Sequence, residues 1–500
     1  MGGEKSYHLA RIDRERILNA YKAGPDAVVS LIEYLQDQHH ATLEELLDIL
    51  KILRARIEAL EEKNNKDSHN SNKPPSSDGV SKRFFRKRRT SGKKPGGQPG
   101  HEGTTLNMVT SPDHVQIHKV KKCRCCGRAL KDEKPRGYEK RQVFDIPQIA
   151  VEVTEHQAEE KLCSHCGELT VAEFPEGIDH KTQYGRRVQA FAVYLKNYGF
   201  LSYSRTAEAL SDLFAIPISA GTLAGIDRRC AARLQGVVEE IRKKLMKADV
   251  AHFDETGLSV NGELYWLHGT GTPRFTYYYP HKNRGTAAID EIGILPGLMG
   301  TAVHDNWKPY FKYCCSHSLC NAHHIRELIS VYEEGGQPWA QQMIGLLIEG
   351  KEAVQRAKQE GKKALDRNQI QAYRDRYEQI IVFGMKANPP PTFISHRRGP
   401  VKRTKARNLL DRLAMRTEET LRYLSDFHVP FDNNLAERDI RMTKLQQKIS
   451  GTFRSYEGAL SFCRIRSYIS TVRKQGRSVI DAIVYTFEKN LTLTNCLQNS

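Results

Sequence analysis

The stretch Ala248–Val260, with the sequence ADVAHFDETGLSV, indicates the fold of the central part of this 500-residue chain. Its residues predict a β-strand that carries Asp254. Two more β-like runs, Leu264–Gly269 and Arg274–Tyr279, follow after Gly-rich turns. Three short strands with such connections predict an antiparallel meander.

A second Asp follows another apolar run. After a helical segment, Thr286–Ile292, the run Leu298–Val303 leads to Asp305. Two strands that each deliver an Asp at a similar depth are what a shared metal site on a sheet requires. A single Asp at a strand end is usually a turn former or a cap, so the pair carries the hypothesis. Glu255 should point to the opposite face of its strand and is the less favoured ligand.

A third carboxylate comes much later in the chain. The stretch Phe431–Arg438, FDNNLAER, predicts the start of a helix with Asn433 or Asn434 as its N-cap. Glu437, one turn into that helix, can lean onto the sheet. Asp254, Asp305 and Glu437 would then hold two Mg²⁺ or Mn²⁺ ions about 3.5 to 4 Å apart. Without metal, three clustered carboxylates repel one another, so the cations are implied.

Two cysteine knuckles predict a structural zinc site. Cys123-x-x-Cys126-Gly and Cys163-x-x-Cys166-Gly can place four thiolates around one Zn²⁺, and each Gly permits a turn that aims backbone amides at the sulfurs. Cys125 and His165 lie inside the knuckles and are interpreted as bystanders. Residues Val143–Val153 are predicted to be extended, as in a zinc ribbon.

Composition points to a polyanionic partner and a reducing compartment. The chain has 77 Lys and Arg against 59 Asp and Glu, a formal charge of +18, which favours nucleic acid as the partner. The 11 cysteines include two tight pairs, which favours metal binding over disulfides. With neither a signal peptide nor a run of roughly 18 apolar residues, the chain is expected in the cytosol, with no membrane partner.

The N-terminal part predicts a zipper-like helix followed by a basic arm. Apolar residues recur at heptad spacing, which predicts either self-association or packing within one domain: Leu43, Leu46, Leu50, Leu53, Ile57 and Leu60. A polar linker follows, and then Lys82–Lys94 has basic residues, two Phe and no acid. A solvated spacer is the alternative to phosphate binding by this arm. Its predicted DNA-binding residues are Lys82, Arg83, Arg86, Lys87, Arg88 and Arg89.

Helical patterns occupy two further regions. Within Gly185–Leu245, the stretch Ser204–Cys230 has the spacing of a helix-turn-helix, and a scaffold hairpin is the alternative. Between Glu327 and Leu424, helical spacing, for example at Gly350–Arg367, interrupts the sheet pattern.

The segments beside the proposed carboxylates have their own interpretations. Cys314–His324 is interpreted as a buried strand that runs into a helix, although a second zinc site is an alternative. Cations follow Glu437 and are predicted to bind phosphate, with a solvated helix face as the alternative: Arg438, Arg441, Lys444, Lys448 and Arg454.

Several short segments of the chain form a characteristic set: Asn70–Asp78, Lys94–His101, the two knuckles, Asp254-Glu255-Thr256, His304-Asp305-Asn306-Trp307, Cys320-x-Ala322-His323 and Asn433-Asn434-x-Ala436-Glu437-Arg438. Through these segments the chain resembles the insertion-sequence-66 family of bacterial transposases. The resemblance implies an RNase H-like core with Asp254 on its first strand, Asp305 after its fourth, and Glu437 on a helix beyond an insertion. It places His323 near the catalytic sheet.

The expected fold is multidomain α+β, an RNase H-like catalytic α/β core with a helical insertion. Before the core come a zipper-like helix, a zinc ribbon and a helical DNA-binding region. The expected segments are 1–65 zipper-like, 66–105 basic linker, 106–172 zinc ribbon, 173–245 helix-turn-helix-like, 246–331 first part of the core, 332–424 insertion, and 425–500 second part of the core with C-terminal helices.

The expected function is that of an Asp-Asp-Glu transposase. It would bind the terminal inverted repeats of its element, cleave the ends and join 3′ hydroxyls to target DNA. A homo-oligomer on paired DNA ends, small accessory proteins of the same element, and a bacterial, nucleoid-associated location are expected with it. The alternatives are a zinc-containing DNA binder with an inactive core and a hydrolytic RNase H-like nuclease.

Overall fold

The computed structural model describes residues 14–37, 39–40, 43–44, 47, 50, 106–147, 149–390 and 403–488. The chain divides into two compact units, Met1–Phe85 and Arg86–Ser500. In the first unit, α1 (Arg14–Ala23) is followed at Gly24 by a second helical run over residues 25–37. Among the described residues, no helix is both long and apolar enough to cross a bilayer.

The zipper prediction is covered only in part. Of the six heptad positions, Leu43 and Leu50 are described, and both are helical and exposed. The other four lie outside the described residues, and so do the six predicted DNA-binding residues of the basic arm. Self-association through this helix and phosphate binding by the arm therefore stay predictions.

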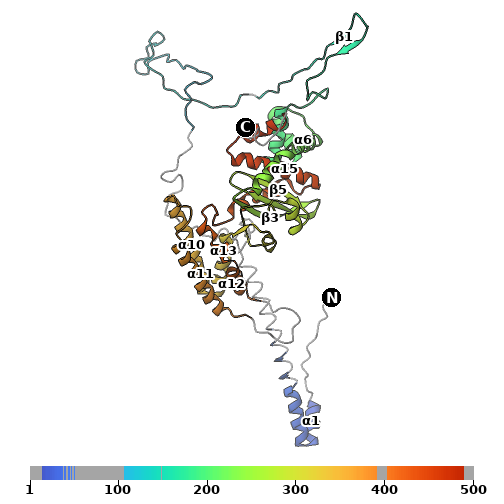
Figure 1. The fold of residues 1–500 in the computed structure, drawn as a ribbon, viewed down its shortest axis with the longest axis vertical. Coiled ribbons are helices and arrows are strands. Elements are labelled where there is room, and N and C mark those ends of the chain that lie inside the picture. Colours follow the sequence, from blue (N-terminus) through green and yellow to red (C-terminus); the bar gives the residue numbers. More distant parts are fainter. Residues whose placement is uncertain are drawn as a thin grey trace. The chain divides into compact units, whose positions relative to one another are not determined.

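A five-stranded mixed sheet forms the centre of the second unit (Figure 1). Its order is β5 (Thr276–His281), β4 (Glu263–Gly271), β3 (Val250–Val260), β6 (Thr301–His304) and β7 (Ser316–Leu319). The first three strands are antiparallel, and β6 and β7 run parallel to β3. The predicted meander is confirmed, and the helix expected before β6 is α8 (Thr286–Ile292). Asn261 and Gly262, with φ of 51° and 80°, make the tight β3–β4 turn.

Both edges of this sheet are engaged by helices. On β5, the N–H of Thr276 donates to Thr471 Oγ1 at 3.1 Å, and the N–H of Tyr278 donates to Ser467 Oγ at 2.9 Å. Both acceptors lie on α15 (Tyr456–Lys474). On β7, the carbonyl of His317 accepts a hydrogen bond from Arg422 Nε at 2.8 Å, from α13 (Thr417–Ser425).

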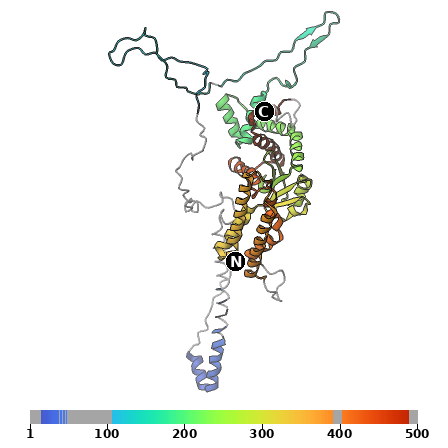
Figure 2. The same cartoon turned by 60° about the vertical axis from the view of Figure 1, so that its left-hand side comes forward.

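Helices that precede the sheet in the chain and helices that follow it form one hydrophobic core with the sheet (Figures 1 and 2). They are α4 (Arg186–Val193), the π-helical Tyr194–Tyr198, α5 (Tyr203–Phe214), α6 (Ala220–Arg233), α7 (Gln235–Met246), α15 and α16 (Val479–Thr486). The predicted pair of helices is present as α5 and α6, and the side chain of Ser219 caps α6. Because α6 buries Leu223, Ile226 and Cys230 in this core, its packing agrees with the scaffold alternative.

The predicted helical insertion has a core of its own around Trp339 and Tyr377. It consists of α9 (Asn321–Gly335), α10 (Pro338–Gln359), α11 (Arg367–Ala387), α12 (Lys405–Met415) and α13. The helix predicted over Gly350–Arg367 ends earlier, at Gln359, because Gly361 adopts a φ of 77°. The interpretation of Cys314–His324 as a strand that runs into a helix is confirmed by β7 and α9.

The knuckle region contains less regular structure than predicted. Its strands are β1 (Glu160–Leu162) and β2 (Leu169–Val171), an antiparallel pair around the second knuckle. The extended run predicted at Val143–Val153 is not a strand at its described residues, which exclude 148. Val143 and Val153 are 91% and 88% exposed. Their spacing suits a strand, but here they lack the sheet partner and the core that would hold one.

Candidate functional site

The sheet brings the first two predicted carboxylates into register. β3 and β6 pair in parallel, with Val250 opposite Thr301 and His252 opposite Val303. Asp254 and Asp305 each lie two residues beyond the last of these pairs, at the same level along the two strands. Both side chains are partly exposed. The sequence prediction of two Asp residues at comparable depth is therefore consistent with the strand pairing.

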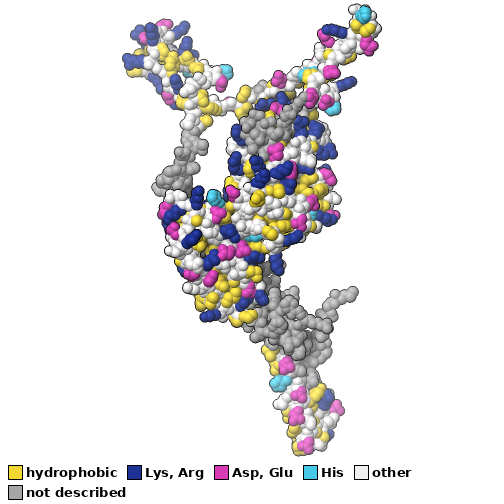
Figure 3. Space-filling model, viewed as in Figure 1, with side chains coloured by type: hydrophobic (Ala, Val, Ile, Leu, Met, Phe, Trp, Pro, Cys, Tyr) yellow, Lys and Arg dark blue, Asp and Glu magenta, His cyan; other side chains and the backbone are white. Residues whose placement is uncertain are grey.

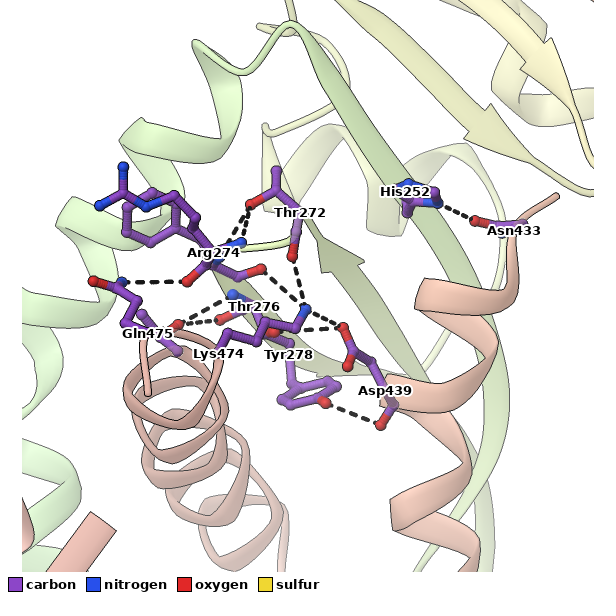
Figure 4. Close-up of polar contacts among 11 residues, drawn as sticks. His252, Thr272, Arg274, Thr276, Tyr278, Asn433, Asp439, Lys474 and Gln475 are labelled. Carbon is purple, nitrogen blue, oxygen red and sulfur yellow. Dashed lines mark hydrogen bonds and ion pairs between the residues drawn. The ribbon is translucent and has the colours of Figure 1, made fainter. Parts of the chain in front are cut away.

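The third carboxylate is positioned by the start of α14 (Asn434–Ser450). Asn433 precedes the helix, but its side chain does not cap it. Instead, Asn433 Nδ2 donates to the carbonyl oxygen of Phe253 at 2.8 Å, and Asn433 Oδ1 lies 2.8 Å from His252 Nδ1 (Figure 4). The N-cap position was predicted correctly, whereas this bridge to the strand of Asp254 was not. The bridge joins residues that are 181 positions apart, so no local pattern signals it.

A glycine lets α14 approach the sheet beside Asp254. Gly269 is the β4 partner of Asp254, and a Cβ on it would lie only 3.1 Å from Cγ1 of Ile440 on α14. A larger residue at 269 would push the helix away from the strand. The missing side chain at Gly269 therefore leaves room for the helix that carries Glu437.

Asp439 and Lys474 join α14 to α15 and to the β4–β5 connection (Figure 4). Their side chains form an ion pair at 2.5 Å, and Lys474 Nζ also donates to the carbonyl oxygen of Thr272 at 2.9 Å. The hydroxyl of Tyr278 donates to the backbone carbonyl of Asp439 at 2.9 Å. These contacts, which the sequence interpretation missed, brace the helix two residues beyond Glu437.

The electrostatics of Asp254 show that the acidic residues act on one another. Burial, and then the negative charges of Glu255, Asp305 and Glu437, raise the pKa of Asp254 well above its usual value. One hydrogen bond opposes this, since Asp254 Oδ1 accepts from the N–H of Glu255 at 2.9 Å. A partly buried carboxylate surrounded by other negative charges, as Asp254 is, attracts cations.

Glu437 lies among cationic and metal-ligating side chains. One oxygen is 3.1 Å from an Arg441 nitrogen. The other, Oε1, is 3.7 Å from His323 and 3.9 Å from Arg326, yet it is buried and has no hydrogen-bond partner. An acceptor left in this state fits a site that takes a cation.

The ligand distances identify a different set from the predicted one. Among the described residues, Cys320, His323 and Glu437 offer ligand atoms that all lie within 4.8 Å of one another. Asp254, Asp305 and Glu437 do not form such a set. The three carboxylates share the oxygen donors that Mg²⁺ prefers, and the charges of Asp305 and Glu437 act on Asp254.

Glu255, the less favoured ligand in the sequence interpretation, has hydrogen-bond partners of its own. Its buried carboxylate accepts hydrogen bonds from Arg284 Nε at 2.7 Å and from the hydroxyl of Tyr310. The Arg284 guanidinium lies over the rings of Trp266 and Trp307, at 4.9 Å and 4.3 Å from their centroids. No sequence pattern indicates these contacts of Glu255 and Arg284, because the residues involved come from separate elements.

The predicted cations follow Glu437 along an exposed face. Arg438, Arg441, Lys444 and Lys448 lie on α14, Arg454 follows it, and all five are exposed. Two of them already have partners, because Arg441 pairs with Glu437 and Lys444 Nζ donates to the Gly257 carbonyl at 2.7 Å. Arg438, Lys448 and Arg454 are the better candidates for phosphate contacts.

The two knuckles have the same local geometry. The N–H of Cys123 donates to the carbonyl of Arg128, and that of Gly127 donates to Cys123 at 3.1 Å. The second knuckle repeats both bonds through Cys163 and Gly167. In each, amides of the following residues lower the pKa of the first thiol: Cys126 and Cys125 act on Cys123, and Cys166 and His165 act on Cys163. Each knuckle therefore suits half of a zinc site.

The structure does not bring the four knuckle thiols together. Among the described residues they form no set of ligand atoms within 4.8 Å. The turns form through local hydrogen bonds, whereas convergence of the two knuckles has to come from longer-range contacts or from a bound ion.

Comparisons with known families cover most of the chain. The model of the family described as "Transposase IS66 family" matches residues 181–461, more than half of the chain. A second model, the zinc-finger binding domain of transposase IS66, matches residues 121–167, which hold all four knuckle cysteines. Residues 28–107 match a family of unknown function. Comparison with curated protein sequences finds no match.

Proposed function

Because the chain belongs to the IS66 family of transposases, we propose that it cleaves the ends of its mobile element and joins their 3′ hydroxyls to target DNA. Asp254, Asp305 and Glu437 would be the carboxylates that perform this reaction. The observation that carries the proposal is the register of β3 and β6, which sets the two Asp residues side by side, together with the charge of Glu437 acting on Asp254.

The strand order supports an RNase H-like core. Three antiparallel strands in the order β5-β4-β3, followed by β6 and β7 parallel to β3, put the first strand in the middle of the sheet. Asp254 is on that strand and Asp305 follows the fourth. The helices α9 to α13 then separate Asp305 from Glu437, as the proposed insertion requires.

The carboxylates would hold two Mg²⁺ ions. Such ions activate the attacking hydroxyl and stabilise the leaving oxygen of an in-line displacement. Asp254 would help to hold them together with Asp305 on the neighbouring strand β6 and Glu437 on α14. Asn433 and Gly269 are positioning residues, since they hold α14 against β3 at the level of Asp254.

The DNA would lie along basic side chains near this site. Arg438, Lys448 and Arg454 are exposed after Glu437 and would contact the phosphates on either side of the cut. Lys and Arg side chains also gather on the part of the surface labelled α6 and α15 in Figure 1, as Figure 3 shows. On α6 the exposed cations include Arg228 and Arg229. A duplex that follows this charge would run from α14 towards α6.

The zinc-finger match supports a structural Zn²⁺ held by the four knuckle cysteines. We infer that this segment and the basic arm hold the inverted repeats while the sheet performs the chemistry. Pairing of two DNA ends would need at least two copies of the chain, joined through the zipper-like helix. The proposed partners also include small accessory proteins encoded by the same element.

A strand-joining assay tests the proposal. Labelled element ends, target DNA and Mg²⁺ are incubated with the wild-type chain and with Asp254→Asn, Asp305→Asn and Glu437→Gln. Each variant should keep DNA binding and lose joining by about a thousandfold, since metal-ion catalysis contributes several kcal/mol. Unchanged joining in a variant removes that residue from the site. Cleavage without joining in the wild-type chain would favour a hydrolytic nuclease, and binding without cleavage an inactive core.

A further inference from the structure

The tightest group of metal-ligating side chains contains a thiol. Cys320 is the residue before α9, His323 lies in the first turn of α9, and Glu437 comes from the first turn of α14. Their ligand atoms lie within 4.8 Å of one another, which is close to the roughly 3.3 to 3.6 Å between ligands of a tetrahedral zinc ion. Small side-chain rotations would close the difference.

Two buried atoms in this group lack a hydrogen-bond partner. They are His323 Nδ1 and Glu437 Oε1. Burial of a polar atom without a partner costs free energy, and a bound cation would remove this cost. The third member is oriented as well, because the backbone N–H of Asn433 donates to Cys320 Sγ at 3.1 Å. This bond aims the sulfur towards the start of α14. Three donors from two helix starts therefore face one point.

The donor types separate this group from a magnesium site. Mg²⁺ prefers oxygen ligands and an octahedral shell, whereas a sulfur, an imidazole nitrogen and a carboxylate oxygen suit Zn²⁺ or Co²⁺. Burial raises the pKa of the Cys320 thiol, and the amide of Asn433 opposes this shift. Nothing in the reaction proposed above uses a thiol at this position.

We propose that Cys320, His323 and Glu437 form a binding site for a soft divalent cation of the Zn²⁺ type. Binding replaces the thiol proton, which passes to solvent, and a water molecule completes the tetrahedron. The site shares Glu437 with the proposed magnesium centre, so one carboxylate serves two alternative ions. Zn²⁺ bound here withdraws Glu437 from Asp254 and Asp305, and the chain is inhibited by zinc in the presence of Mg²⁺. This inhibition, unlike the binding, rests on the proposed function.

Metal binding is tested on the full chain without any DNA. Zinc content and Co²⁺ absorption are measured for the wild type, Cys320→Ser and His323→Gln, with Cys315→Ser, at the residue before β7, as a matched control. Cys320→Ser should lose one zinc equivalent and part of the thiolate-to-cobalt charge-transfer band, and His323→Gln should shift the visible cobalt bands. The control should keep both signals. A Cys320→Ser spectrum and zinc content equal to the wild type overturn the proposal.

The knuckle zinc and misfolding are separated by two further measurements. A variant with Cys123→Ser and Cys163→Ser removes the knuckle signal, and the Cys320-dependent band should remain in it. Thermal unfolding reports whether each variant is folded. If Cys320→Ser does not fold, His323→Gln decides the outcome, because a shift of the visible cobalt bands supports the site and a spectrum equal to that of the wild type overturns it.

The inhibitory role is tested by the ratio of strand joining with and without added Zn²⁺, at constant Mg²⁺. At a zinc concentration about ten times the measured Kd, joining by the wild type and by Cys315→Ser should fall about tenfold. Cys320→Ser should show a ratio near one. Equal inhibition of all three chains overturns the shared use of Glu437 and leaves the binding result standing. A wild-type chain that joins no DNA contradicts the proposed function, while the metal measurements remain interpretable.

Discussion

The carboxylate region and the knuckle region position their proposed metal ligands in different ways. In both, the proposed metal ligands come from residues far apart in the chain. At the sheet, Asn433 bonds to Phe253 and Ile440 packs over Gly269, so protein contacts set the positions. At the knuckles, each turn is complete, but the four thiols do not meet.

This difference shows what an ion contributes in each region. A packed core can hold a ligand set together against its own charge, as the raised pKa of Asp254 shows. An exposed segment without a core has no such support. We infer that Zn²⁺ is a structural link between the knuckles, whereas Mg²⁺ would bind to a site that is already built.

The largest expected effect is on the knuckle region. Removal of zinc by a chelator, or Cys126→Ser, should make residues 106–172 sensitive to protease, because zinc binding contributes on the order of 10 kcal/mol to such segments. Residues 181–488 should keep their thermal transition. Limited proteolysis followed by calorimetry measures both. If zinc removal also abolished the thermal transition of residues 181–488, the two regions would not be independent, which would contradict the prediction.

The next effect concerns the bridge between α14 and β3. Asn433→Ala should lower the free energy of unfolding by about 1 to 3 kcal/mol, because it leaves the buried Phe253 carbonyl without its partner. Strand joining should fall further than this loss of stability explains, since Glu437 loses its position. Urea unfolding and the joining assay measure the two effects. Asn434→Ala, at the exposed neighbouring residue, is the control and should change neither by much.

A smaller effect follows from charge repulsion at Asp254. Because its folded-state pKa is raised, the ionised carboxylate lowers stability at neutral pH, and this deficit disappears as the pH falls and the group is protonated. Without Mg²⁺, Asp254→Asn should raise the Tm by a few degrees, about 1 kcal/mol, with a smaller gain at acidic pH. Mg²⁺ should raise the Tm of the wild type and not of the variant. A variant that melts earlier at neutral pH would mean that packing, and not charge, dominates at this residue.

The smallest effect separates the DNA contacts of α14 from those of the knuckle region. Arg438→Ala and Lys448→Ala should each reduce the salt dependence of DNA binding by about 0.9 in the logarithmic slope, if each cation neutralises one phosphate. Lys386→Ala, an exposed cation on α11, is the matched control. Slopes measured by fluorescence anisotropy at several salt concentrations give the answer. Unchanged slopes in both variants would move the phosphate contacts to other parts of the chain.

The sequence allowed the elements of the sheet to be predicted better than their connections. α8 lies where the sequence placed it, because apolar runs and local turns determine such elements. Asp305 follows the end of β6 and Glu437 lies in the first turn of α14, whereas Asp254 lies within β3, which continues to Val260. The bonds of Asn433 and the partners of Glu255 depend on tertiary contacts between distant segments. No periodicity reports such contacts.

The errors have physical causes of the same kind. Val143–Val153 has the spacing of a strand, but a strand also needs a partner and a buried face. The helix expected to continue to Arg367 stops where Gly361 takes a left-handed conformation. For Cys320 and His323 the sequence offers a second zinc site only as an alternative, since their relation to Glu437 exists only in three dimensions.

The hydroxyl groups of Ser467 and Thr471 have one more consequence. By accepting the outward N–H groups of β5, they leave that edge unable to template the addition of another strand. Several copies of the chain crowded on one stretch of DNA would therefore resist the edge-to-edge stacking that leads open sheets to aggregate.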